Sequence, residues 1–180
     1  MSAVVRLERP DDRRASLRVE KAAFSRLDEA AIVGRVRDEP GSFALVAIED
    51  DEVVGHVQMS RAWIGSQPLL ALGPIAVLPD RQGRGIGSAL VREALQEARR
   101  RDEVGVMLLG SPDYYPRFGF RPGATWGLRN PFTGVQESGF VVEERDFMLV
   151  PLTEPEPPLS GEVRWHPAFG PAVEAPGEPR

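Results

Sequence analysis

The chain has 180 residues, of which 42% are hydrophobic and 27% are charged, and its formal net charge is −5 at pH 7. This size and composition are typical of one ordinary globular domain, and an acidic chain lacks the basic excess expected of a general nucleic-acid-binding protein. The chain contains no cysteine and only two histidines, His56 and His166, so we expect no disulfide framework, no thiolate nucleophile and no metal site.

The N-terminal half of the chain predicts two helices followed by three strands. Apolar residues recur at helical spacing over Asp11–Phe24 and again over Asp28–Asp38. Three strand-like runs follow, at Phe43–Ile48, Val53–Ile64 and Leu69–Leu78. They are expected to pair as consecutive antiparallel strands. The third run is almost wholly apolar, which is typical of a strand buried on both faces.

A long amphipathic helix is predicted to begin in a glycine-rich stretch and to end near Arg101. Its apolar face is marked at i, i+4 spacing by Ile86, Leu90, Ala94 and Ala98. The apolar run Val104–Leu109 then predicts another strand. Because a strand, a helix and a strand in succession form a crossover unit, this strand is expected to lie parallel to Leu69–Leu78.

The rest of the chain is less regular. Asp113–Phe118 predicts a short helix that ends at Gly119, Leu128–Arg145 shows no clear pattern, and Phe147–Leu152 predicts the last strand. From Pro151 onward 8 of 30 residues are proline, so we divide the chain into a domain of residues 1–153 and a proline-rich tail of residues 154–180. Part of the tail is expected to dock through its apolar residues, Val163, Trp165 and Phe169.

Gly83, Gly85 and Gly87 occupy every second position where the long helix should begin. A helix N-terminus presents unpaired N–H groups and a partial positive charge, and glycines let an anion approach the backbone closely. Arg81 and Arg84 add cationic side chains nearby. The stretch therefore predicts a phosphate site, and a flexible turn that simply leads into the helix is the alternative.

Two common phosphate-binding motifs do not fit this stretch. A Walker loop requires G-x-x-x-x-G-K-[ST], and the stretch contains no lysine. A dinucleotide fingerprint requires a third glycine three positions after Gly87, where Leu90 stands. A nucleotide-binding oxidoreductase is therefore poorly supported.

The pattern Gln82-Gly83-Arg84-Gly85-Ile86-Gly87 instead resembles the acyl-CoA motif [QR]-x-x-G-x-[GA] of the GNAT superfamily of N-acetyltransferases. The segment YYPRFGF, Tyr114 to Phe120, resembles that family's Y-x-x-x-G-F segment, and the tail phrase GEVRWHPAFG resembles the ending of one bacterial branch of predicted acetyltransferases. The order of the predicted elements also matches. The resemblance implies an α/β (α+β) fold with a mixed, mostly antiparallel sheet of six or seven strands, flanked by helices and containing a splayed parallel strand pair.

The same resemblance implies an enzyme that moves an acetyl group from acetyl-CoA to a primary amine, by direct attack of the amine on the thioester. The residues implied to bind acetyl-CoA are Ile75, Ala76, Val77, Gln82, Gly83, Arg84, Gly85, Ile86, Gly87 and Ser88. No metal is implied. Pro74 cannot donate to a sheet ladder, so it indicates a local distortion at the acyl end of the strand, and a plain bulge is the alternative.

Tyr115 stands four residues before Gly119, as the tyrosine of the family motif does. The resemblance implies that Tyr115 is the general acid that protonates the leaving thiolate. Tyrosine is protonated at pH 7 and can donate a proton. A buried aromatic residue with a hydrogen-bonded hydroxyl is the alternative, and the neighbouring Tyr114 is expected to point elsewhere.

The sequence identifies no single general base. Neither Leu69–Leu78 nor Val104–Leu109 carries a carboxylate. The candidates that stay open are His56, Asp113, Glu49 and bulk water. His56 is expected to share a strand face with Val54 and Gln58, and that face is expected to point toward the cleft.

The acceptor is expected to be a small-molecule or peptide amine, and a non-catalytic acyl-CoA-binding or regulatory module is the alternative function. The residues Trp126, Arg129, Asn130 and Phe132 either line the acceptor pocket or pack against the sheet edge, and Trp165 and His166 are expected to anchor the tail. No apolar run approaches the roughly 18 residues of a membrane span and no signal peptide is indicated, so we expect a cytoplasmic protein without membrane or nucleic-acid partners. A homodimer stays open.

Overall fold

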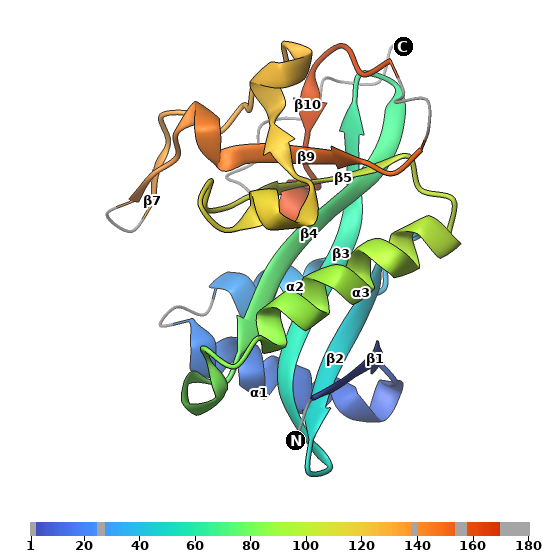
Figure 1. Ribbon diagram of the computed structural model, residues 1–180, viewed down its shortest axis with the longest axis vertical. Coiled ribbons are helices and arrows are strands. Elements are labelled where there is room, and N and C mark those ends of the chain that lie inside the picture. Colours follow the sequence, from blue (N-terminus) through green and yellow to red (C-terminus); the bar gives the residue numbers. More distant parts are fainter. Residues whose placement is uncertain (1–2, 25–27, 138–139, 154–157, 170–180) are drawn as a thin grey trace.

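The computed structural model describes residues 3–24, 28–137, 140–153 and 158–169 (Figure 1). One mixed sheet of eight strands passes through the molecule in the order β1-β2-β3-β4-β5-β9-β6, with β10 paired to β3. The predicted fold class is confirmed. The sheet has more strands than expected because β6 and β10 are only 2 residues long, too short for a periodic signal.

The first four strands form an antiparallel meander: β1 (Val4–Leu7), β2 (Phe43–Glu49), β3 (Glu52–Ile64) and β4 (Gln67–Val77). The three runs predicted from the sequence are β2, β3 and β4, within two residues at each end. The edge strand β1 was not predicted, because it has only 4 residues and Val4 and Leu7 are exposed rather than buried.

Helices cover both faces of this meander (Figure 1). The helix α1 (Arg13–Ala23), preceded by the 3-10 turn η1 (Pro10–Asp12), packs on β3 and β4, and α2 (Asp28–Val36) packs beside α1. The long helix α3 (Ile86–Arg100) packs its apolar face on the opposite side of the sheet. The predicted helices are confirmed, although α2 ends two residues earlier than expected.

The two parallel strands diverge soon after they meet. The strand β5 (Gly105–Leu109) pairs with β4 only at Leu70↔Val106 and Ala71↔Met107. Beyond those pairs β4 continues to Val77 along β3 alone, while β5 pairs along its length with β9 (Phe147–Pro151). The last six residues of β4 therefore have no strand partner on the β5 side, which is the splay that the family resemblance implied.

The remaining elements are short. The 3-10 turns are η2 (Pro79–Arg81), η3 (Tyr115–Phe118), η4 (Gly123–Trp126), η5 (Glu144–Asp146) and η6 (Pro167–Phe169). The short strands are β6 (Arg121–Pro122), β7 (Gln136–Glu137), β8 (Phe140–Val141) and β10 (Val163–Arg164). The expectation that β9 is the last strand was wrong, because β10 in the tail adds to the free edge of β3 near its C-terminal end. Within the described ranges, no helix has both the length and the apolar character needed to cross a bilayer.

Candidate active site

The glycine stretch connects η2 to α3 with two residues in the left-handed backbone region. Gly83 has φ = 74° and Gly85 has φ = 84°, and a Cβ atom added at either position would meet no atom within 4 Å. Glycine is the residue that adopts this conformation without steric cost. The loop is therefore shaped by its glycines and has open space in front of its backbone.

Gly85 is also the N-cap of α3, and no side chain caps the helix there. Intrahelical bonding begins with Ala89 N–H donating to the Gly85 carbonyl at 3.0 Å. The N–H groups of the first turn have no partner within the helix, as at any helix start. With the positive end of the α3 dipole, they form a site suited to a phosphate.

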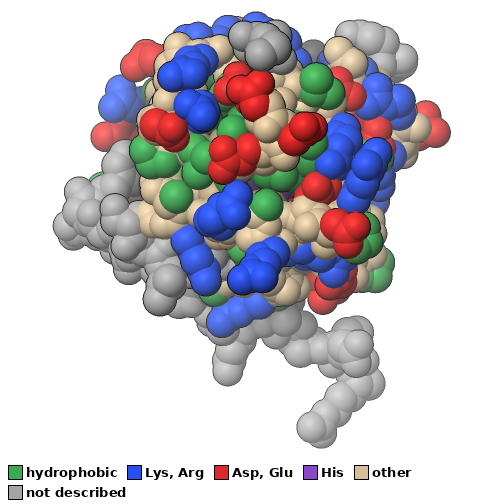
Figure 2. Space-filling view, turned by 90° about the horizontal axis from the view of Figure 1, so that it is seen from below, with side chains coloured by type: hydrophobic (Ala, Val, Ile, Leu, Met, Phe, Trp, Pro, Cys, Tyr) green, Lys and Arg blue, Asp and Glu red, His purple; other side chains and the backbone are tan. Residues whose placement is uncertain are grey.

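The two arginines of the stretch differ in their surroundings. Arg81 lies 3.2 Å from a carboxylate oxygen of Asp80 and 3.7 Å from one of Glu49, so its charge is partly balanced. Arg84 is exposed, and no ion pair is found for it among the described residues. Both side chains line a hollow of about 330 Å³ next to Gly85. Figure 2 looks onto this end of the molecule and shows Lys and Arg side chains interspersed with acidic ones.

Gln82 fixes the loop to the sheet, because its side-chain amide donates to the Val77 carbonyl at 3.0 Å. Ile75, Ala76 and Val77 lie on the unpaired half of β4, where backbone groups that point toward β5 meet no strand. The register between β3 and β4 shifts between Val57 and Met59, opposite Pro74. The strand is therefore irregular at Pro74, and the register shift fits both the predicted distortion and the plain bulge that was its alternative.

Tyr115 is buried on the α3 side of the sheet, and 9% of its surface is exposed. Its ring lies 5.8 Å from that of Phe120 and 5.1 Å from that of Tyr114. Burial raises the pKa of its hydroxyl to about 12. Because its pKa is raised, the hydroxyl is protonated at neutral pH. It makes no hydrogen bond to any described residue, so it can donate to a ligand.

Two residues near Tyr115 differ from the sequence analysis, because Tyr114 was expected to point elsewhere and Gly110 was not named. The hydroxyl of Tyr114 lies 3.0 Å from the hydroxyl of Ser88, so Tyr114 joins η3 to the first turn of α3. Gly110 follows β5, and a Cβ atom there would lie 2.3 Å from the ring of Tyr115. Gly110 therefore makes room for the tyrosine. A glycine directly after a buried strand is the signal that would have indicated it.

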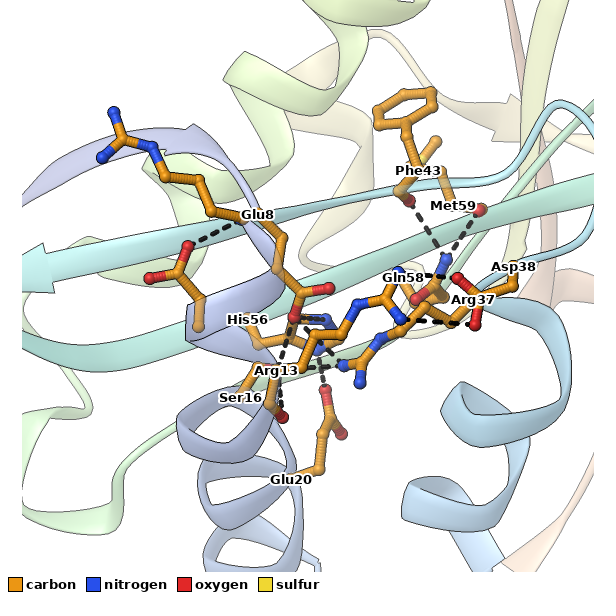
Figure 3. A network of polar contacts seen from close by, with 12 residues as sticks. Glu8, Arg13, Ser16, Glu20, Arg37, Asp38, Phe43, His56, Gln58 and Met59 are labelled. Carbon is orange, nitrogen blue, oxygen red and sulfur yellow. Dashed lines mark hydrogen bonds and ion pairs between the residues drawn. The ribbon is translucent and has the colours of Figure 1, made fainter.

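His56 does not face a cleft. The residue is completely buried beneath α1, and its Nδ1 lies 2.5 Å from a carboxylate oxygen of the equally buried Glu20 (Figure 3). Gln58 is on the same face of β3, as expected. Val54 is not, because a bulge in β3 turns it toward Leu90 in the core under α3.

The His56 pair belongs to a larger network of buried polar contacts (Figure 3). Glu8 lies 3.8 Å from His56 Nε2 and accepts a hydrogen bond of 3.1 Å from Arg37. Ser16 of α1 donates to Glu8 as well. The network connects β1, α1, the end of α2 and β3, so the sequence expectation that His56 is accessible as a base is not supported by its environment.

The other two base candidates lie at hollows. Glu49 lines the hollow beside Arg84. Asp113 is exposed and lines a second hollow of about 350 Å³ at the C-terminal end of β5, together with Asp146. Among the described residues, no group of three or more His, Cys, Asp or Glu side chains is placed to hold a metal ion.

The irregular stretch after Phe120 packs against the C-terminal tail. Asn130 is buried and accepts a hydrogen bond of 3.0 Å from the indole Nε1 of Trp165. The ring of Phe132 lies 6.2 Å from that of Trp165. Arg121 lies over the ring of Trp126 at 4.5 Å. Trp165 therefore anchors the tail as expected, and His166 accepts a hydrogen bond from the Ala168 N–H.

Comparisons with known proteins agree with this geometry. The family model described as "Acetyltransferase (GNAT) family" matches residues 3–120. The uncharacterised N-acetyltransferase YjhQ of Escherichia coli is 31% identical over 154 residues, which cover 81% of this chain and 82% of the relative.

Two solved structures cover almost the whole chain. YhbS from Escherichia coli, a GNAT family N-acetyltransferase in complex with CoA, superposes with a TM-score of 0.82 at 28% identity over 94% of this chain and 92% of its own. A GNAT family acetyltransferase from Brucella melitensis in complex with acetyl-CoA gives a TM-score of 0.70 at 32% identity over 93% and 98%.

Proposed function

The chain belongs to the acetyltransferase (GNAT) family of N-acetyltransferases, and from this premise we propose that it transfers the acetyl group of acetyl-CoA to a primary amine by direct attack of the amine on the thioester. The observation that carries the proposal is the glycine loop at the start of α3. Its backbone is held open by Gly83 and Gly85, and it lies next to the unpaired half of β4. The CoA and acetyl-CoA bound in the two similar structures support the same ligand class here.

The residues present fit acetyl-CoA. The N–H groups from Gly83 to Ser88 would hold the pyrophosphate, and Arg84 would add positive charge beside it. Gln82 keeps the loop against β4. The main-chain groups of Ile75–Val77 would pair with the amides of the pantetheine arm, because buried backbone groups need partners.

Tyr115 would serve as the general acid. Acetyl-CoA supplies an activated thioester, and its thiol leaves as an anion that must be protonated or stabilised. Because the pKa of the Tyr115 hydroxyl is raised to about 12, the group carries its proton at any physiological pH. Tyr114 and Gly110 would position it, the first from the α3 side and the second by leaving space for the ring.

We propose that water takes the proton of the attacking amine. β4 and β5 carry no carboxylate, and His56 is buried and already engaged by Glu20. Asp113, which lines the hollow that follows β5, would then accept the proton from this water. In this proposal the acceptor is a small-molecule or peptide amine and the enzyme works in the cytoplasm.

The function is tested by incubating the purified protein with acetyl-CoA and a panel of primary amines, while thiol release and the masses of the amines are followed. We expect thiol release that depends on an amine, and one amine that gains a single acetyl group. Tyr115→Phe should lower kcat by at least about a hundredfold, the range for a lost general acid. Binding of acetyl-CoA without any acetylated amine would instead favour the acyl-CoA-binding module.

A further inference from the structure

The C-terminal segment Val163–Phe169 connects the surroundings of the two diverging strands, β4 and β5. The ring of Trp165 lies 6.2 Å from the ring of Phe147. Phe147 begins β9 and pairs with Leu109, the last residue of β5. The turn η6 in the same segment packs against α2, and α2 contacts β4. The segment therefore reaches from the strands β5 and β9 to the helix α2, which contacts β4.

This bridge lies on the face of the sheet away from α3. Val163 shares a buried cluster with Leu69, Ala71 and Phe147, whereas α3 packs on a separate cluster that contains Leu70. The glycine loop opens at the α3 N-terminus, so the phosphate end of acetyl-CoA would lie at one end of the cleft. The tail lies on the other face, where Trp165 contacts Phe147 beside β5 and η6 contacts α2.

The surface that the tail presents there is aromatic. Phe132, Trp165 and Phe169 are each half-buried. The Trp165 ring lies 6.2 Å from the Phe132 ring with the planes inclined by 35°, and 6.0 Å from the Phe169 ring with the planes inclined by 51°. Because the rings are tilted rather than stacked, parts of their faces are not covered by one another.

Asn130 behind these rings has unused hydrogen-bonding capacity. An indole N–H can only donate, so the contact with Trp165 must be made by Asn130 Oδ1, and Nδ2 points away from it. Asn130 is 4% exposed, and its Nδ2 finds no partner among the described residues. Because buried donors are normally hydrogen-bonded, Asn130 Nδ2 is free to donate to a polar group that approaches it.

We propose that Trp165 and Phe169 of the tail form the acceptor-facing wall of the active site, and that they select amines carried on an aromatic body. The inference rests on the proposed function and deepens it by naming the acceptor class. An aromatic ring of the acceptor packs on the faces of Trp165 and Phe169, and Asn130 keeps the Trp165 ring in position. The aliphatic chain then directs the amine toward the splay.

The experiment measures binding rather than turnover. The full-length protein is saturated with CoA and titrated by calorimetry with 2-phenylethylamine and with n-butylamine, which share a primary aminoalkyl group and differ in the ring. We expect 2-phenylethylamine to bind about tenfold more tightly, the gain from one aromatic contact. Phe169→Ala should abolish most of this preference, and Phe132→Ala should do so from the other segment.

Arg164→Ala is the matched control, because Arg164 lies in the same segment but extends over Trp63 and donates to the Gly65 carbonyl. This variant should retain the full preference for the aromatic amine. Equal binding of the two amines, no binding of either, or a preference that survives in both phenylalanine variants would overturn the inference. The proposed function is judged separately, by acetyl-CoA binding and by the thiol-release assay.

Discussion

The burial of Tyr115 has a measurable consequence for stability at high pH. A tyrosine in an unfolded chain has a pKa near 10, and burial raises the pKa of this hydroxyl to about 12 in the folded protein. Because the folded pKa is the higher one, the stabilisation is fully present below pH 10 and is lost as the pH rises through 12. The expected loss is about 2 to 3 kcal/mol of unfolding free energy. Urea unfolding at several pH values measures it, and Tyr115→Phe should remove this part of the slope.

Gly110 tests the packing that orients Tyr115. In Gly110→Ala the new methyl group would lie 2.3 Å from the ring, so the ring must move. We expect a loss of about 1 to 3 kcal/mol in stability, with a larger proportional loss in kcat than in acetyl-CoA binding. Gly34→Ala is the control, since a Cβ atom there meets nothing within 4 Å. Equal stability of the two variants would show that the ring is loosely held.

At the level of elements, α1 is held to β3 by the buried His56 and Glu20 pair. Removing one member of a buried hydrogen-bonded pair leaves the polar atom of the other without its partner, so Glu20→Ala should cost about 1 to 3 kcal/mol. The double variant His56→Leu, Glu20→Leu should recover much of that loss, because apolar side chains can replace a buried pair. Thermal melting measures both variants.

The exposed pair of Arg13 and Asp38 provides the comparison for this prediction. The Asp38 side chain is 72% exposed, and an exposed ion pair contributes less than about 1 kcal/mol. Asp38→Ala should therefore melt almost as the unaltered protein does. A similar small effect of Glu20→Ala would contradict the assignment of His56 and Glu20 as a structural pair.

The sequence predicted those elements whose signal is local. The apolar runs of β2, β3 and β4 and the periodic face of α3 need no knowledge of their neighbours, and the conformation of Gly83 and Gly85 follows from their position before a helix. β1 and β10 were missed because a short strand becomes a strand only through its partner. The contacts of His56 with Glu20 and of Tyr114 with Ser88 join residues 36 and 26 positions apart, which no local pattern indicates.

At the level of the whole molecule, the tail is part of the folded unit. Leu159 and Val163 are buried at 7% and 2% exposure, and β10 extends the sheet beyond the boundary we placed at residue 153. Burial of two such side chains contributes about 3 to 6 kcal/mol. A chain that ends at residue 153 should therefore melt well below the full chain. An unchanged melting temperature would show that the tail contributes no stability.

Thermal melting with and without acetyl-CoA is the most direct test of the central claim, that the glycine loop of this N-acetyltransferase holds acetyl-CoA. A ligand at about 100 times its Kd adds roughly 2.7 kcal/mol of stability. The comparison uses Gly85→Glu and Gly127→Glu, because both glycines have positive φ and open space around a Cβ atom, and only Gly85 lies in the loop. We expect a clear upward shift for the unaltered protein and for Gly127→Glu, and no shift for Gly85→Glu. A shift that survives in Gly85→Glu, or no shift in any of the three, would contradict it.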